Sequence, residues 1–195
     1  NPMLGPNMGA QGLVMRRILD RPFTITEYNY SGPGRFRGVG GIACGTAAAL
    51  QDWSGLWRFA WSHGISGVKG PKAMNYFDMS GDPLGLASER ASICLFLRRD
   101  LEPLTKTYAL VLPPKDLASM GASPMMTTSF PWLSWYAKTG NIVADAAPAG
   151  TTWSARYPDC LAAKSADVRQ TVLPGASAES MPVAGDGAVQ IDSKT

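Results

Sequence analysis

The chain has 195 residues, of which 45% are hydrophobic and 17% are charged, and its formal net charge is +3. These values are typical of a soluble globular protein with a hydrophobic core, and no basic stripe indicates a nucleic-acid partner. No apolar run reaches the roughly 20 residues that cross a membrane, so no membrane partner is expected. The single histidine and the three scattered cysteines lack the spacing of a zinc site, and we expect neither a metal nor another cofactor.

The N-terminal stretch begins at Asn1 without an initiator methionine and without a signal peptide. We therefore expect the sequence to be cut from a longer protein. Apolar residues at helical spacing predict a first helix over residues 7–19, with Asn7 as its N-cap. Pro22 cannot continue that helix.

Strand and helix patterns alternate over the next part of the chain. β-branched residues predict a strand over residues 23–27, and a helix over 39–53 follows. The pattern repeats with a strand over residues 56–61 and a helix over 87–99. Gly-rich loops follow the two strands, over residues 28–38 and 62–70. This order predicts an α/β fold with parallel strands and crossover helices, equivalent to the last quarter of a (β/α)8 TIM barrel.

The sequence changes character after residue 100. Alternating apolar residues predict a strand over residues 107–112, and weaker strand patterns lie at 141–144 and 187–192. We expect residues 1–100 to be the last strand–helix units of a TIM-barrel catalytic domain. Residues 101–195 are expected to be a wrapping layer and the start of a β-rich accessory domain.

Glu27 is the last residue of the first predicted strand, and a long Gly-rich loop follows it. Functional side chains of parallel barrels lie at the C-terminal ends of the strands, facing the mouth. This position suits a catalytic carboxylate. The alternative is an ordinary ion pair between Glu27 and Arg35 or Arg37 in the following loop.

A family resemblance is carried by an ordered series of segments, which covers about half of the chain. They are Pro22-Phe-Thr-Ile-Thr-Glu-Tyr-Asn29, Ala47-Ala-Ala-Leu-Gln-Asp-Trp53, Gly55-Leu-Trp-Arg-Phe-Ala-Trp61, Phe77-Asp-Met-Ser-Gly-Asp-Pro83 and Ile93-Cys-Leu-Phe-Leu-Arg-Arg99. In this order they resemble the last two strand–helix units of the glycoside hydrolases with (β/α)8 barrels. The β-galactosidase and agarase-like families are the most similar in character.

The resemblance implies a retaining β-glycosidase that acts on galactoside-like oligo- or polysaccharides, with Glu27 as its nucleophile. It also implies a second carboxylic acid from an earlier strand, commonly placed after an asparagine, which acts as the acid/base. No Asn-Glu pair occurs in the sequence. We therefore expect the acid/base in an upstream part of the same barrel, and we expect this segment by itself to be inactive.

Six residues around Glu27 are candidates for binding the sugar, because aromatic rings stack on sugar C–H faces and polar neighbours bind hydroxyls. Trp61 and His63 lie at or past the end of the second strand, with barrel packing and a carbonyl cap as the alternatives. The other four follow Glu27 or lie in its loop: Tyr28, Asn29, Tyr30 and Arg35. A tyrosine here can hold the charge of Glu27, whereas the alternative for Arg35 is a solvated loop.

Three charged residues have open roles. Asp78 and Asp82 either bind sugar hydroxyls or serve in turns and helix capping. Arg58 lies in a predicted barrel strand and needs a carboxylate partner, which we expect from the missing strands.

The function expected from the residues and the resemblance is glycoside hydrolysis, with a carbohydrate as the partner. A secreted or periplasmic location is expected for an enzyme that degrades polysaccharides. The alternative is a non-catalytic carbohydrate-binding or scaffold protein that keeps the groove of a barrel without its chemistry.

Overall fold

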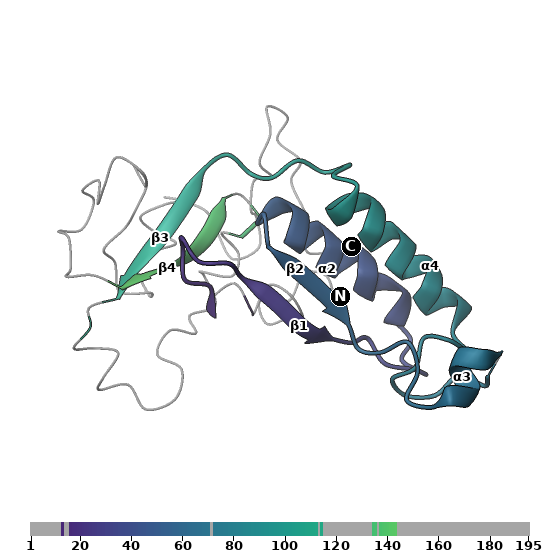
Figure 1. The fold of residues 1–195 in the computed structure, drawn as a ribbon. Coiled ribbons are helices and arrows are strands. Elements are labelled where there is room, and N and C mark those ends of the chain that lie inside the picture. Colours follow the sequence, from purple (N-terminus) through teal and green to yellow (C-terminus); the bar gives the residue numbers. More distant parts are fainter. Residues whose placement is uncertain are drawn as a thin grey trace. The chain divides into compact units, whose positions relative to one another are not determined.

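The structure, a computed structural model, describes residue 13 and residues 16–70, 72–112, 114, 134–135 and 137–143. Residues 22–103 belong to one compact unit, and the described residues before 22 and after 103 belong to a second. Figure 1 shows the ribbon of the chain. The first unit contains every candidate site residue of the sequence analysis.

Two parallel strands form the sheet of the first unit. Strand β1 spans Thr24–Tyr28 and strand β2 spans Gly55–Arg58. Thr24 lies opposite Gly55 and Ile25 opposite Leu56, but Tyr28 lies opposite Arg58, so β1 has one extra residue between these pairs. The irregularity is a β-bulge, which changes the face on which the following side chains lie.

Two helices pack together beside this sheet. Helix α2 spans Gly40–Leu50 and connects β1 to β2, whereas α4 spans Pro83–Ser92 and follows β2. A Cβ on Gly41 would lie 2.2 Å from the Ser88 carbonyl oxygen, and one on Gly45 would lie 2.6 Å from the Ser92 Cα. These matched pairs show that the helices run in the same direction and in very close contact (Figure 1).

This arrangement consists of two successive strand–helix units with parallel strands and parallel helices. The parallel pairing and the crossover helix expected from the sequence are therefore present, which is the pattern of α/β folds. Gly41 and Gly45 of α2 permit the close approach of α4.

The segment between β2 and α4 is folded against the ends of the strands. It includes the short helix α3, Ile65–Lys69, where the sequence predicted only a loop. The backbone N–H of Ala60 donates to the carbonyl of Phe77 at 3.2 Å, and the N–H of Met79 donates to the carbonyl of Ala60 at 3.0 Å. Residues 77–80 thus pair with the chain that continues from β2.

Two short helices complete the first unit, and two strands belong to the second. A 3-10 helix, η2, spans Arg37–Val39 before α2, and a π-helix, η3, spans Ile93–Leu97 after α4. In the second unit, strand β3, Thr107–Leu112, pairs in parallel with β4, Lys138–Val143. The predicted strand at 107–112 is confirmed, and the weak strand pattern at 141–144 corresponds to β4.

Several predicted boundaries are wrong, and the helix expected over residues 39–53 ends at Leu50. The helix expected to end at Leu19 does not reach it, because Ile18 forms a parallel bridge with Asn141. The second strand ends at Arg58 rather than Trp61. The helix expected from Ala87 begins at Pro83, because the Asp82 side chain accepts from the Leu84 N–H at 3.2 Å and caps it. The predicted strand at 187–192 lies outside the described residues.

Candidate functional site

Glu27 is the next-to-last residue of β1 and its side chain is exposed. Its neighbour Tyr28 is buried, and so is Ile25 on the other side of the bulge. Because Thr26 and Glu27 together lie opposite the single residue Trp57, these three belong to the bulge region of the sheet. All three are exposed, so Glu27 faces away from the helices.

Trp57 lies in β2 with its side chain at the surface and not in the core. Its side chain is 54% exposed and leans over Gly55, where a Cβ would lie 2.3 Å from the indole ring. The buried tryptophan of this region is Trp53, whose ring contacts Phe23 edge-on at 5.4 Å. The Trp57 indole thus leans toward the start of the two strands, where Gly55 pairs with Thr24, and not toward the end that carries Glu27.

The ion-pair alternative for Glu27 is not found. Arg37 pairs with Asp82, with 2.7 Å between Nε and Oδ2, and Arg35 lies over the ring of Phe36 at 5.6 Å. With the described part of the chain, the Glu27 side chain forms neither a hydrogen bond nor an ion pair. Glu27 is thus an exposed carboxylate without a neutralising partner among these residues.

Tyr28 belongs to a buried polar group on the helix side of the sheet. Its hydroxyl donates to Glu89 on α4, and the Glu89 carboxylate lies 3.6 Å from the guanidinium of Arg58. Arg58 also lies over the Tyr28 ring at 5.7 Å. Burial, and secondly the bond with Glu89, raise the pKa of Tyr28 well above its usual range. The hydroxyl of Tyr28, which was expected to hold the charge of Glu27, therefore donates its hydrogen bond to Glu89.

Arg58 consequently has its carboxylate partner within this sequence, and the expectation of a partner from the missing strands is wrong for it. The side chains of Arg58 and Glu89 are only 10% and 15% exposed. Burial raises the pKa of Glu89, although the hydrogen bond from Tyr28 and the charge of Arg58 oppose this shift. The group ties α4 to the ends of both strands.

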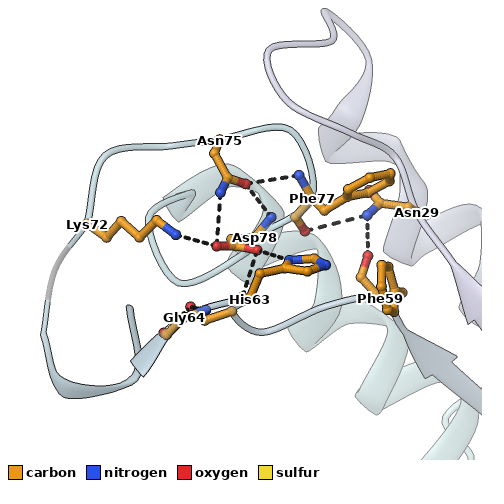
Figure 2. A network of polar contacts seen from close by, with 9 residues as sticks. Asn29, Phe59, His63, Gly64, Lys72, Asn75, Phe77 and Asp78 are labelled. Carbon is orange, nitrogen blue, oxygen red and sulfur yellow. Dashed lines mark hydrogen bonds and ion pairs between the residues drawn. The ribbon is translucent and has the colours of Figure 1, made fainter. Parts of the chain in front are cut away.

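Asn29 and Tyr30 also make structural contacts. The Asn29 side-chain amide donates to the carbonyls of Phe59 and Phe77 and so links the end of β1 to the segment after β2 (Figure 2). The Tyr30 ring covers the start of α2, where a Cβ on Gly40 would lie 2.5 Å from it. Burial raises the pKa of Tyr30 to about 12.

His63 and Asp78 are the centre of a polar network past the end of β2 (Figure 2). One Asp78 oxygen accepts from the backbone N–H of His63 at 3.1 Å and also contacts the His63 ring at Nδ1. The other oxygen accepts from Lys72 at 2.5 Å and from Asn75 at 2.9 Å. The bond with His63, followed by that with Lys72, holds the pKa of the Asp78 carboxyl well below its usual range.

Asn75 completes this network through its side-chain oxygen. That oxygen accepts from the backbone N–H of Phe77 at 3.0 Å and from that of Asp78 at 2.8 Å. The sequence Asn75-Tyr-Phe-Asp78 thus forms a turn of the kind in which asparagine binds its own following backbone. Asp78 thus has the turn role, one of the two left open for it, because its carboxylate and its backbone N–H both bond with Asn75.

An aromatic group surrounds His63. The His63 ring lies 5.0 Å from the Phe59 ring and 5.9 Å from the Phe77 ring, and Phe77 contacts Tyr76 edge-on at 4.6 Å. Trp61, which is 50% exposed, lies three residues past the end of β2. Among the predicted site residues, the structure brings Asn29 and His63 together through Phe59 and Phe77, and no contact joins either to Glu27 in the described ranges.

The sequence analysis missed Lys72, Asn75 and Tyr76. The Asn75-x-x-Asp78 spacing was the one signal that could have pointed to the network, because such spacing is typical of side chains that close turns. The contact of Lys72 with Asp78 has no sequence signature, since it depends on how the loop folds. Asp82, in contrast, has the capping role that its position before Pro83 indicated.

The described residues lack two features. They contain no group of three or more histidine, cysteine, aspartate or glutamate residues arranged to hold a metal ion. Within the same part of the chain, no helix is both long and apolar enough to span a membrane. Comparison with protein-family models, with curated proteins and with solved structures finds no match.

Proposed function

We propose that this chain carries the nucleophile of a retaining β-glycosidase, and that the nucleophile is Glu27. The observation that supports this most is the carboxylate of Glu27, which is exposed and has no partner in the described part of the chain, near the C-terminal end of a parallel strand. Arg35 and Arg37, the cations that could have neutralised it in a structural role, are engaged elsewhere. In parallel α/β folds, this end of the sheet is where catalytic side chains lie.

The proposed reaction is a double displacement. Glu27 attacks the anomeric carbon to form a glycosyl-enzyme, while a carboxylic acid protonates the leaving oxygen and then activates water. The two carboxyl groups of such an enzyme lie about 5–5.5 Å apart.

Three other carboxylates of the same unit are committed to other contacts. Asp78 binds His63 and Lys72, and Asp82 binds Arg37 and caps α4. Glu89 lies on the helix side of the sheet with Tyr28. We therefore propose that the acid/base comes from residues outside this sequence, on an earlier strand of a complete (β/α)8 barrel.

The test uses the complete protein and substitutions at Glu27. Glu27→Gln is expected to lower turnover of aryl β-galactosides at least a thousandfold, on the order of 4 kcal/mol in the barrier. Glu27→Ala with added azide is expected to regain turnover and to give the glycosyl azide of inverted configuration, because the small anion replaces the carboxylate. The control is Glu102→Gln, which changes another exposed glutamate. Substantial activity of Glu27→Gln would refute the proposal.

A second candidate is a non-catalytic carbohydrate-binding protein. The commitment of Asp78, Asp82 and Glu89 to structural contacts favours it, because it leaves Glu27 without a second carboxylate among the described residues. This candidate predicts that the complete protein binds β-galactosides without hydrolysing them. It also predicts that Glu27→Gln weakens that binding by no more than tenfold, the effect of one hydrogen bond.

A further inference from the structure

The imidazole of His63 is held by one nitrogen and is free at the other. Nδ1 contacts Asp78, whereas Nε2 has no hydrogen-bond partner among the described residues. The His63 side chain is 47% exposed, but the carboxylate that holds it is only 1% exposed. A buried carboxylate behind an exposed imidazole is an arrangement that orients a histidine for contact with a ligand.

The ring contact is not needed to close the loop. The backbone N–H of His63 already donates to Asp78, and Lys72 and Asn75 bind the other carboxylate oxygen. Asn75 closes its own turn through the N–H groups of Phe77 and Asp78. A different side chain at residue 63 would leave these bonds in place. The contact between the His63 ring and Asp78 is therefore not required for the fold of the loop.

The bond to Asp78 determines which nitrogen of the neutral ring carries the proton. An ionised carboxylate only accepts hydrogen bonds, so Nδ1 must be the donor. Nε2 is then the acceptor, and its lone pair has a fixed direction. An acceptor of this kind suits a hydroxyl group, which donates one hydrogen bond.

Apolar surface lies next to that acceptor. Phe77 lies between His63 and Tyr76 in a row of ring contacts, at 5.9 Å and 4.6 Å. Tyr76 is 61% exposed, and its backbone is held in place because its carbonyl accepts from the Gly32 N–H at 3.0 Å. A hydroxyl acceptor beside exposed aromatic rings matches the two surfaces of a sugar, its hydroxyl edge and its C–H face.

We propose that His63, Phe77 and Tyr76 form a sugar subsite past the end of β2, in which His63 Nε2 accepts from a sugar hydroxyl and Tyr76 packs on the sugar ring. Asp78 is the positioning residue of this subsite and does not touch the sugar. The inference rests on the carbohydrate part of the proposed function and is independent of catalysis at Glu27.

The first experiment reads the protonation of His63 directly. His63 is the only histidine in the sequence, and a His63→Gln variant identifies its signals in the nitrogen NMR spectrum of histidine-labelled protein. At mildly alkaline pH, Nδ1 is expected to carry the proton and Nε2 to be bare. This is the reverse of the tautomer that free histidine prefers. A proton on Nε2 in the neutral ring overturns the proposal.

The second experiment adds sugar. In the Glu27→Gln background, which removes turnover, the protein is titrated with methyl β-glycosides of galactose, glucose, mannose and xylose. One of them is expected to move the His63 Nε2 signal at saturation. Tyr76→Ala is expected to weaken that sugar's binding roughly three- to tenfold, whereas Tyr76→Phe keeps it. Absence of any Nε2 shift across the panel overturns the subsite.

A third variant separates positioning from folding. Asp78→Asn keeps the size of the side chain but replaces one of its two accepting oxygens by an NH2 donor, so Asp78 no longer fixes the tautomer of His63 and the response of the Nε2 signal to the sugar is expected to weaken. Failure of the subsite and failure of the proposed function remain distinguishable. If Glu27→Gln is inactive and the His63 Nε2 signal does not shift with sugar, only the subsite is rejected. If Glu27→Gln is active and the Nε2 signal does shift, only the role of Glu27 as nucleophile is rejected.

Discussion

Asp78 binds His63 twice, through the backbone N–H at 3.1 Å and through the ring nitrogen Nδ1, while its other oxygen binds Lys72. One buried carboxylate thus joins the chain that leaves β2 to the loop that returns toward α4. Because the site residues past β2 lie in this segment, the network determines the shape of that edge of the candidate site.

The network makes the stability of the fold depend on pH. The bonds from His63 and Lys72 hold the pKa of Asp78 below its ordinary value. A carboxyl with a lowered folded-state pKa stabilises the fold above its unfolded pKa, about 3.9, and this contribution is lost as the pH falls further. Asp78→Asn should therefore lower the melting temperature at pH 7, and the difference from wild type should shrink below pH 4.

An exposed ion pair provides the control for this prediction. Asp100 has its pKa lowered by the bond with Arg98, but both side chains are exposed. Exposed pairs contribute little to stability, so Asp100→Asn should leave the melting temperature nearly unchanged. Equal losses for the two variants would contradict the role assigned to Asp78.

Replacing Arg58 should leave Glu89 as a buried, uncompensated charge. Arg58→Leu is expected to cost about 3 kcal/mol at pH 7, because breaking a buried pair strands its partner. The pKa of Glu89 is raised by burial, so Glu89 takes up a proton on acidification and the cost should fall with it. Denaturant unfolding at pH 7 and at pH 4.5 measures both values. Arg35→Leu, at an exposed position, should change stability little, and a cost for Arg58→Leu that grows in acid would be inconsistent with this account.

The contact between α2 and α4 should be intolerant of a single methyl group. In Gly41→Ala the Cβ would lie 2.2 Å from the Ser88 carbonyl oxygen. Alanine improves helix propensity by about 1 kcal/mol, but overpacking typically costs 1–3 kcal/mol or more and should dominate. Chemical denaturation should show a net loss of stability.

Gly70→Ala is the matched control, because no atom lies within 4 Å of the added Cβ and the backbone there is extended. It should change the unfolding free energy by about 0.5 kcal/mol or less. If Gly41→Ala were as stable as Gly70→Ala, the close helix contact would be wrong.

Asp82 combines a helix cap with an ion pair, and two substitutions separate them. Burial alone would raise the pKa of Asp82, but the bond from Arg37 and the backbone N–H groups at the start of α4 leave it lowered. Asp82→Ala should cost about 1–2 kcal/mol through loss of the cap. Asp82→Asn keeps a capping oxygen and should therefore lose less stability than Asp82→Ala. The loss that remains is due to the missing negative charge, and it should disappear below about pH 4, where the wild-type carboxyl is protonated as well. Thermal unfolding across this pH range measures the difference.

Local patterns predicted the elements whose signals lie within a few residues. The β-branched run before Glu27 corresponds to β1, and the alternating residues from Thr107 to Leu112 form β3 as expected. The alternation of strands and helices gave the parallel pairing of β1 with β2. The sequence places helix α4 four residues late, because Asp82 followed by Pro83 fits a turn as well as a helix start.

The features that sequence reasoning missed depend on distant partners. β2 ends at Arg58, and Ala60, two residues later, bonds with Phe77 and Met79, some twenty positions away. The partner of Arg58 is Glu89 on a helix, and no pattern in either segment specifies that pair. The bulge in β1 places Glu27 and Thr26 together opposite Trp57, and a strict alternation of faces does not predict it.

The most direct measurement of the central claim is covalent trapping of the nucleophile. The complete protein is incubated with a β-galactoside that carries a dinitrophenyl leaving group and fluorine in place of the hydroxyl next to the anomeric carbon. This compound forms a glycosyl-enzyme that hydrolyses slowly, so mass spectrometry of the digested protein can locate it. The account predicts the fluorosugar on the peptide that contains Glu27, and no labelling of Glu27→Gln. A stable label on any other carboxylate, with Glu27 unmodified, would contradict it.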